Sequence, residues 1–232
     1  MFLSACAHKR TQVATPPPPP PAAQTPSGEN VPPAQEPAGN GELNVPADAK
    51  PIFEQTGLAS WYGPPYHNRR GSNGEIYNMN AMTAAHLTLP LGSIVRVTNI
   101  KTGHFALVRI TDRGPFVEGR ILDLSLAAAK ALDVYLPGTA MVRLEVLEAP
   151  AALDVGGRWC VQIGSFVDEK GAAETAGRLQ RRYQTAKVQK FPSPTGNWWV
   201  RVRVLGDDRQ RAMEMLRENE ISEASAFLVR LD

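Results

Sequence analysis

The sequence is poor in cysteine, in net charge and in long apolar runs. Its 232 residues contain two cysteines, Cys6 and Cys160, and carry a formal net charge of +2. Two cysteines so far apart, one of them in a proline-rich start, do not indicate a disulfide framework, and Cys160 reads as a small buried apolar residue within a strand. The small net charge argues against nucleic-acid binding. No stretch approaches the roughly 18 apolar residues of a membrane-spanning helix.

The first 56 residues also have few large apolar side chains. They hold the run Pro16–Pro21 and several scattered prolines. A segment of this composition does not bury enough surface to offset its ordering entropy, and its prolines favour extended polyproline II stretches. We therefore expect residues 1–56 to be a disordered linker, followed by two domains of modest size.

From Gly57 the sequence changes to short alternating runs. The predicted elements are strands at 59–62, 94–99, 106–111 and 141–147 and a helix at 125–132. Lys101-Thr102-Gly103 has the composition of a hairpin turn, and Ser125 is a good helix cap. Many short strands with glycine-rich turns and one small helix are typical of a small closed barrel.

A second ordered stretch follows the small-residue linker 149–157. Its predicted elements are strands at 159–166, 186–191, 198–204 and 226–231, with helices beginning at Asp168 and Asp207. In the third of these strands the valines at 200, 202 and 204 should face the helices. Because alternate residues of a strand share a side, Trp199 and Arg201 should then lie on the open face of the sheet, joined by Gln162 from the first strand.

Polar residues gather at the turns of the first domain. The motifs are Gly57-Leu58-Ala59-Ser60-Trp61-Tyr62-Gly63, Asn73-Gly74-Glu75, Thr83-Ala84-Ala85-His86, Asp112-Arg113-Gly114-Pro115 and Ile121-Leu122-Asp123-Leu124-Ser125. Together they resemble the double-psi β-barrel domain of the rare lipoprotein A family of septal-ring lytic transglycosylases. The β-α-β-β-α-β order of the second domain, opened by Val161-Gln162-Ile163-Gly164-Ser165-Phe166, resembles the SPOR (sporulation-related) domain.

These resemblances imply a fold and an activity. The expected fold is mostly β plus α+β: a six-stranded double-psi β-barrel at 57–148 and a β-α-β-β-α-β SPOR domain at 158–232. The implied activity is that of a lyase, which cuts the β-1,4 bond between N-acetylmuramic acid (MurNAc) and N-acetylglucosamine (GlcNAc) in peptide-free glycan strands. Such cleavage leaves 1,6-anhydroMurNAc ends during septal wall remodelling. We expect denuded peptidoglycan strands and divisome proteins as partners, and no nucleic acid, cofactor or metal. The open-face residues Gln162, Trp199 and Arg201 are the candidate glycan-binding surface of the second domain, and a solvent-exposed face with extended arginines is the alternative.

Asp112 is the predicted catalytic acid. It follows an apolar strand and precedes Gly114-Pro115, so it should lie at a strand end, and the resemblance assigns its position the role of general acid/base. A turn-forming aspartate is the alternative. The same resemblance carries a functional role to Glu75 and His86, either in orienting Asp112 or in hydrogen bonding to the glycan. A buried structural histidine is the alternative for His86.

Other residues of the barrel are secondary candidates. Asp123 is a competing acid, but pairing with Arg113 or Arg120 would lower its pKa and make it structural. Arg113 is also a candidate for binding the lactyl carboxylate of muramic acid. Trp61 and Tyr62 should point to opposite sides of their strand, so one is expected in the core and the other toward a sugar.

Leu3-Ser4-Ala5-Cys6 resembles a bacterial lipobox, which would place a lipid on Cys6 and anchor the protein to the outer membrane on its periplasmic side. Only five residues precede Cys6, so lipidation would require translation to start upstream of Met1. Two other functions compete with the lytic one. A noncatalytic wall-binding protein, as among the related expansins, needs no acid. RNA binding would suit the topology of the second domain, but the weak charge and the missing aromatic pair argue against it.

Overall fold

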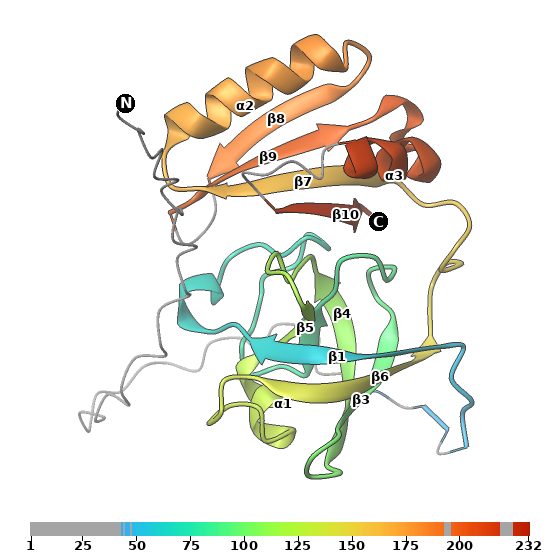
Figure 1. Cartoon of the computed structure of the whole chain (residues 1–232). Helices are drawn as coiled ribbons and strands as arrows, with labels where there is room; N and C mark the ends of the chain where they lie inside the picture. The colour runs from blue at the N-terminus through green and yellow to red at the C-terminus, as the bar shows by residue number, and fades with distance from the viewer. Residues whose placement is uncertain (1–42, 44, 47, 193–195, 219–224) are drawn as a thin grey trace, which may run out of the picture. The chain divides into compact units, whose positions relative to one another are not determined.

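The structure, a computed structural model, describes residues 43, 45, 46, 48–192, 196–218 and 225–232 (Figure 1). Cys6 and most of the expected linker lie outside the described residues, as does part of the turn after Pro192. Within the described residues, no helix has the length and apolar character needed to cross a bilayer.

Six strands of the first domain form a closed barrel in the order β1-β5-β2-β4-β3-β6. The elements are β1 (Phe53–Trp61), η1 (Pro64–Tyr66), β2 (Thr83–Ala85), β3 (Ile94–Asn99), β4 (Phe105–Asp112), β5 (Arg120–Leu124), α1 (Leu126–Ala131) and β6 (Ala140–Glu148). Two pairings, β1 with β5 and β2 with β4, are parallel, and the other pairings are antiparallel. The predicted six-stranded barrel is confirmed.

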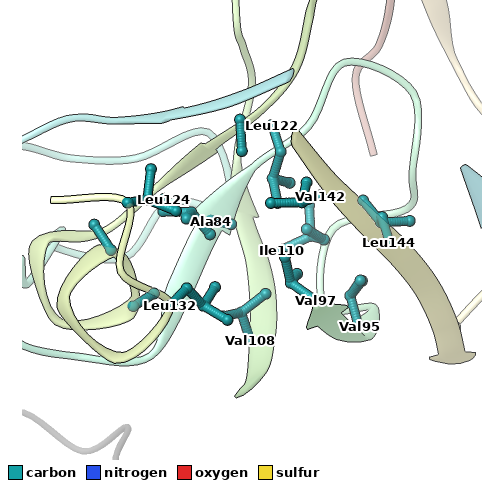
Figure 2. Packing of buried hydrophobic residues seen from close by; sticks show 14 of the residues in the cluster. Ala84, Val95, Val97, Val108, Ile110, Leu122, Leu124, Leu132, Val142 and Leu144 are labelled. Carbon is teal, nitrogen blue, oxygen red and sulfur yellow. The ribbon is translucent and has the colours of Figure 1, made fainter. Parts of the chain in front are cut away.

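Alternation along the strands fills the barrel with branched side chains (Figure 2). Val95 and Val97 of β3 and Val108 and Ile110 of β4 are fully buried, as are members of β5, β6 and α1. Burial of each such side chain contributes roughly 1.5–3 kcal/mol. The core therefore holds the strand ends, where the polar motifs lie, in fixed positions.

The boundaries of some barrel elements differ from the sequence prediction. β1 begins at Phe53, inside the expected linker, because residues 53–59 pair with β6. The strands β2, of three residues, and β5, of five, were not predicted, because such short segments show too few alternations of apolar and polar residues. The predicted cap of α1 is confirmed: Ser125 Oγ accepts a hydrogen bond from Ala128 N at 3.1 Å.

The second domain is a four-stranded antiparallel sheet in the order β10-β7-β9-β8. Its elements are β7 (Trp159–Phe166), α2 (Glu169–Arg182), β8 (Lys187–Pro192), β9 (Trp198–Arg203), η2 (Leu205–Asp207), α3 (Arg209–Glu218) and β10 (Ala226–Arg230). Both helices cover one face of this sheet (Figure 1). Val161, Val200 and Val202 pack beneath the helices, and Cys160 is buried with a free thiol. The predicted β-α-β-β-α-β order is confirmed.

One predicted helix start in this domain is wrong. Asp168 caps α2 as expected, with Oδ1 accepting from Gly171 N at 2.7 Å. The cap of α3, however, is Asp208, whose Oδ1 accepts from Arg211 N at 2.8 Å. Asp207 instead accepts a hydrogen bond from Arg203 Nε at 3.0 Å, so its carboxylate is occupied by an ion pair.

Candidate functional site

Asp112 lies at the last position of β4, as the sequence predicted. Its Oδ1 accepts hydrogen bonds from Ser72 N at 3.0 Å, Ser72 Oγ at 2.5 Å and Arg113 N at 2.8 Å. Three hydrogen bonds to one oxygen hold the Asp112 carboxyl group in a single orientation.

The loop 70–76 brings Ser72 to this position. It folds back on itself through a hydrogen bond from Gly71 N to Glu75 O, and it docks on β4 through Asn73 N, which donates to Thr111 O at 3.2 Å. A Cβ added at Gly71 would lie 3.7 Å from Asp112 Oδ2. The main chain of the loop therefore lies close to the second carboxylate oxygen as well.

Glu75 is exposed on the same loop. Its Oε2 accepts a hydrogen bond from Asn73 Nδ2 at 2.7 Å, and its backbone N–H donates to Asn73 Oδ1 at 3.0 Å. Asn73 thus holds both the side chain and the main chain of Glu75. The structure places Glu75 and the hydrogen-bond partner of Asp112, Ser72, on one short loop, so the two predicted carboxylates belong to one region.

The imidazole of His86, the residue after β2, is buried. Its Nδ1 accepts hydrogen bonds from Thr88 N and Leu89 N, both at 3.1 Å, and its Nε2 lies 3.2 Å from Gln55 Oε1. Because Nδ1 accepts, the neutral ring carries its hydrogen on Nε2 and donates it to Gln55. Burial, assisted by the charge of Arg113, lowers the pKa of His86 to about 3. Both ring nitrogens are therefore used inside the barrel.

The main chain of His86 touches Asp112 directly: its N–H donates to Asp112 O at 3.1 Å. Arg113 then holds the same segment from the other side, since its Nη1 donates to His86 O at 3.0 Å and to Leu89 O at 2.6 Å. The buried guanidinium of Arg113 is thus committed to backbone carbonyls. This geometry does not support the predicted contact of Arg113 with a lactyl carboxylate.

Asp123, the competing acid, is the penultimate residue of β5. Its Oδ1 accepts a hydrogen bond from Ser60 Oγ at 2.5 Å, and its Oδ2 lies 3.5 Å from Arg120 Nη2. The predicted partner Arg120 is present, but the predicted lowering of the pKa is wrong. Burial raises the pKa of Asp123, and this effect outweighs the opposing effects of Arg120 and Ser60.

The two neighbouring aromatics of β1 separate as alternation predicted. Trp61 packs against the barrel core and against Tyr135, with ring centroids 5.1 Å apart. Tyr62 stacks on Tyr77 at 4.4 Å. Burial raises the pKa of Tyr62 well above its ordinary value, and the charges of Asp112 and Asp123 add to this effect. Tyr62 is therefore the aromatic on the side of the two aspartates.

Sequence reasoning missed Ser72 and Tyr77 as members of the site. Tyr77 follows the Asn73-Gly74-Glu75 motif by two residues, and its Oη donates to Tyr62 O at 2.9 Å; its place beside the motif was the available signal. Ser72 carried no such signal, because its contact with Asp112 spans 40 positions of the chain.

The remaining barrel histidines have local partners. His67 Nδ1 accepts from Met79 N at 3.3 Å, and His104 Nδ1 lies 2.6 Å from Asp133 Oδ2. Within the part of the chain that the structure describes, no group of three or more His, Cys, Asp or Glu side chains is placed to hold a metal ion.

On the second domain, the predicted open-face residues are neighbours. Gln162 of β7 pairs in register with Arg201 of β9, and Gln162 Oε1 accepts from Arg201 Nε at 3.2 Å and Nη2 at 2.8 Å. Gln162 is itself buried, and its side-chain oxygen holds the Arg201 guanidinium. Trp199 pairs in register with Phe191, whose ring lies 5.0 Å from the Arg201 guanidinium. Phe191 was not predicted, although alternation in β8 would have placed it there.

Comparison with known proteins assigns both domains. Residues 54–144 match the lytic transglycolase family model, and residues 155–230 match the SPOR domain model. The chain carries a lytic transglycolase domain followed by a SPOR domain. The double-psi β-barrel predicted for the first domain and the SPOR fold predicted for the second are confirmed.

Curated relatives match part of the chain. The chain is 39% identical over 170 residues to "Endolytic peptidoglycan transglycosylase RlpA" of Campylobacter jejuni, covering 63% of this chain and 62% of the relative. It is 48% identical over 128 residues to the protein of the same name from Vibrio cholerae, covering 51% and 49%. The chain thus spans about half to three-fifths of the length of these relatives.

Two solved structures align with parts of this chain at low sequence identity and low TM-score. The Streptomyces papain inhibitor has a TM-score of 0.35 and 20% identity, covering 44% of this chain and all of the inhibitor. The expansin of Clavibacter michiganensis, without ligand, has a TM-score of 0.34 and 13% identity, covering 77% of this chain and 86% of the expansin.

Proposed function

We propose that this protein is a lytic transglycosylase, which cuts the MurNAc–GlcNAc β-1,4 bond of peptidoglycan and leaves a 1,6-anhydroMurNAc end. The lytic transglycolase domain and the names of its relatives support this proposal. The structural observation that carries it is the carboxylate of Asp112, which three hydrogen bonds hold at the end of β4 on the side of Tyr62.

The reaction requires two proton transfers and no water. One proton goes to the glycosidic oxygen as its bond to C1 of MurNAc breaks. The other leaves the 6-hydroxyl of the same MurNAc as its oxygen attacks C1. Because the nucleophile belongs to the substrate, proximity replaces the activated water of a hydrolase. We assign Asp112 to proton exchange with the substrate.

The other predicted residues support Asp112 in different ways. Glu75 is exposed on the loop that carries Ser72, so we assign it to hydrogen bonding with the glycan. His86 is a positioning residue: its ring holds the backbone of Thr88 and Leu89, and its own N–H donates to Asp112 O. Tyr62, stacked on Tyr77 and beside both aspartates, shapes the side of the site on which we expect a sugar to bind.

We further propose that the SPOR domain binds glycan strands stripped of their peptides. Trp199, with its neighbour Phe191, and Arg201 combine aromatic faces with a fixed guanidinium on the side of the sheet opposite α2 and α3. Such a surface suits sugar rings and their hydroxyls. The corresponding setting is the periplasm at the division septum, where denuded strands and divisome proteins meet.

The lipid anchor remains a prediction on Cys6. Its test is incorporation of labelled fatty acid in a strain that expresses the gene with its upstream region. Cys6→Ser should abolish labelling and release the protein from the outer membrane. Labelling that persists in this variant would contradict the anchor without affecting the activity proposed for the barrel.

The activity is tested with the purified protein and peptide-free glycan strands. We expect mass spectrometry to show 1,6-anhydroMurNAc ends with the wild type and none with Asp112→Asn, while both proteins co-sediment with the strands. Strands that are bound but uncut by the wild type would make the protein a noncatalytic wall-binding module. Full activity of Asp112→Asn would remove Asp112 from the chemistry.

A further inference from the structure

The two aspartates of the barrel flank a single residue of β2. Ala85 pairs with Asp112 of β4 on one side and with Asp123 of β5 on the other. Neighbouring strands lie about 4.8 Å apart, so the main chains at the two aspartates are about 10 Å apart across β2. The two carboxyl groups thus belong to the two strands that flank β2, in one row.

The row between these aspartates is lined by small residues. Ala85 contributes one methyl group, and Gly114 approaches it from the loop after β4. A Cβ added at Gly114 would lie 3.7 Å from both Ala85 Cβ and Asp123 Oδ2. With φ of 149°, this position also disfavours any side chain. The two carboxyl groups are therefore separated by a methyl group and bare backbone.

The surroundings of the two carboxyl groups are opposite in kind. Asp112 accepts three hydrogen bonds on one oxygen, from Ser72 and from Arg113 N. Asp123 accepts one short hydrogen bond, from Ser60 on β1. The guanidinium of Arg120 on β5 is farther away, with Nη2 3.5 Å from Asp123 Oδ2.

The charged and titratable groups that face Asp123 agree with a proton held there. They are Arg120 on its own strand, Tyr62 after β1 and Asp112 across β2. The charges of Asp112 and Asp123 both raise the pKa of Tyr62, so Tyr62 lies close to both aspartates. Burial raises the pKa of Asp123 against the opposing effects of Arg120 and Ser60. A carboxyl group whose pKa is raised by burial can act as a general acid beside a second carboxyl group.

We propose that Asp123 is a second catalytic carboxyl group, which gives its proton to the glycosidic oxygen while Asp112 takes the proton of the 6-hydroxyl. This inference rests on the proposed function and divides its two proton transfers between two residues. The C1–O bond breaks and its electron pair stays on the leaving oxygen, which receives the proton of Asp123. The O6–H bond breaks, O6 bonds to C1, and Asp112 receives that proton. One proton then passes through solvent from Asp112 to Asp123 and restores the starting state.

A purely structural Asp123 makes a different prediction. In that case its carboxylate serves only to hold Ser60 and Arg120, and Asn at this position would lower stability without changing how turnover depends on pH. In the proposed role, turnover falls at alkaline pH as Asp123 loses its proton. Because Arg120 favours the ionised form of Asp123, removal of its charge should move that alkaline limb to higher pH.

The experiment measures 1,6-anhydroMurNAc formation against pH in the full-length protein. We expect Asp123→Asn to lose about a hundredfold or more in kcat while it still co-sediments with glycan strands. Arg120→Gln, which keeps Asp123, should stay active and shift the alkaline limb to higher pH. The matched control is Arg143→Gln, which removes an exposed arginine paired with Glu145 on β6 and should leave the limb in place.

Two results would overturn the inference. One is an Asp123→Asn variant with near-normal kcat and an unchanged pH profile, and the other is an Arg120→Gln variant whose alkaline limb does not move. Both results presuppose a wild type that forms anhydro ends. A wild type that forms none would instead remove the proposed function itself, and the inference with it.

Discussion

Ser72 donates two hydrogen bonds, from its backbone N–H and from its hydroxyl, to the same carboxylate oxygen of Asp112. The two residues are 40 positions apart in the chain. Their contact fastens the loop 70–76 to the end of β4, so Glu75 and Asp112 are held by one set of hydrogen bonds. The orientation of Asp112 therefore depends on the same loop that carries Glu75.

Removal of the Ser72 hydroxyl should loosen Asp112 without unfolding the barrel. We expect Ser72→Ala to lower kcat for formation of anhydro ends by about tenfold to a hundredfold, since misplacement of a reacting group by about 1 Å has effects of this size. Co-sedimentation with glycan strands should not change. Ser72→Thr keeps the hydroxyl and should retain most of the activity; equal losses in both variants would contradict this account.

The buried His86 should make the barrel less stable in mild acid. Its ordinary pKa of 6.5 falls to about 3 in the folded protein, so the unfolded chain binds a proton between these values and the folded chain does not. The free energy of unfolding therefore falls as pH is lowered through this window, by up to about 1.4 kcal/mol per pH unit from this group.

Denaturant titrations at pH 6.5 and 5.0 would measure this effect. His86→Gln keeps a neutral hydrogen-bonding side chain but does not titrate, so its stability should change less between the two pH values than that of the wild type. Identical pH dependence in the two proteins would show that His86 is not the neutral buried group described above.

Arg113 should act on stability and not on substrate affinity. Its Nη1 serves the carbonyls of His86 and Leu89, and loss of a buried partner leaves such groups unsatisfied at a cost of about 1–3 kcal/mol. We expect Arg113→Met to lower the free energy of unfolding by this order with KM for glycan little changed. A large rise in KM at unchanged stability would instead restore the predicted role in binding the lactyl carboxylate.

Several parts of the fold and site could be predicted from local pattern. The apolar alternation of residues 94–99 and of the strand before Asp112 is strong enough to set the strands β3 and β4, and it placed Asp112 at a strand end. The separation of Trp61 and Tyr62 followed from the same rule. Which of the two rings enters the core is decided by packing, as the contact of Trp61 with Tyr135 shows.

Other parts depend on contacts that no local pattern encodes. The strands β2 and β5 are short and exist because their neighbours pair with them. The link between Ser72 and Asp112 forms only when the loop docks. The pKa of Asp123 was predicted with the wrong sign, because the arginine three residues away was visible in the sequence and the burial was not.

The aromatic face of the SPOR domain should account for much of its glycan binding. We expect Trp199→Ala to weaken co-sedimentation of the protein with peptide-free strands by about tenfold, the order of one lost aromatic contact. Lys170→Ala, on the helix side of the same domain, is the matched control and should bind normally. Equal binding by both variants would exclude Trp199 from the glycan-binding surface.

The most direct test of the lytic mechanism is the source of the oxygen at the new MurNAc end. Wild-type protein is incubated with peptide-free strands in H2(18)O, and the products are analysed by mass spectrometry. Attack by the 6-hydroxyl predicts anhydro ends without the heavy isotope, formed by the wild type and lost in Asp112→Asn. Reducing MurNAc ends that carry the heavy oxygen would show that water is the nucleophile, and the transglycosylase mechanism would be contradicted.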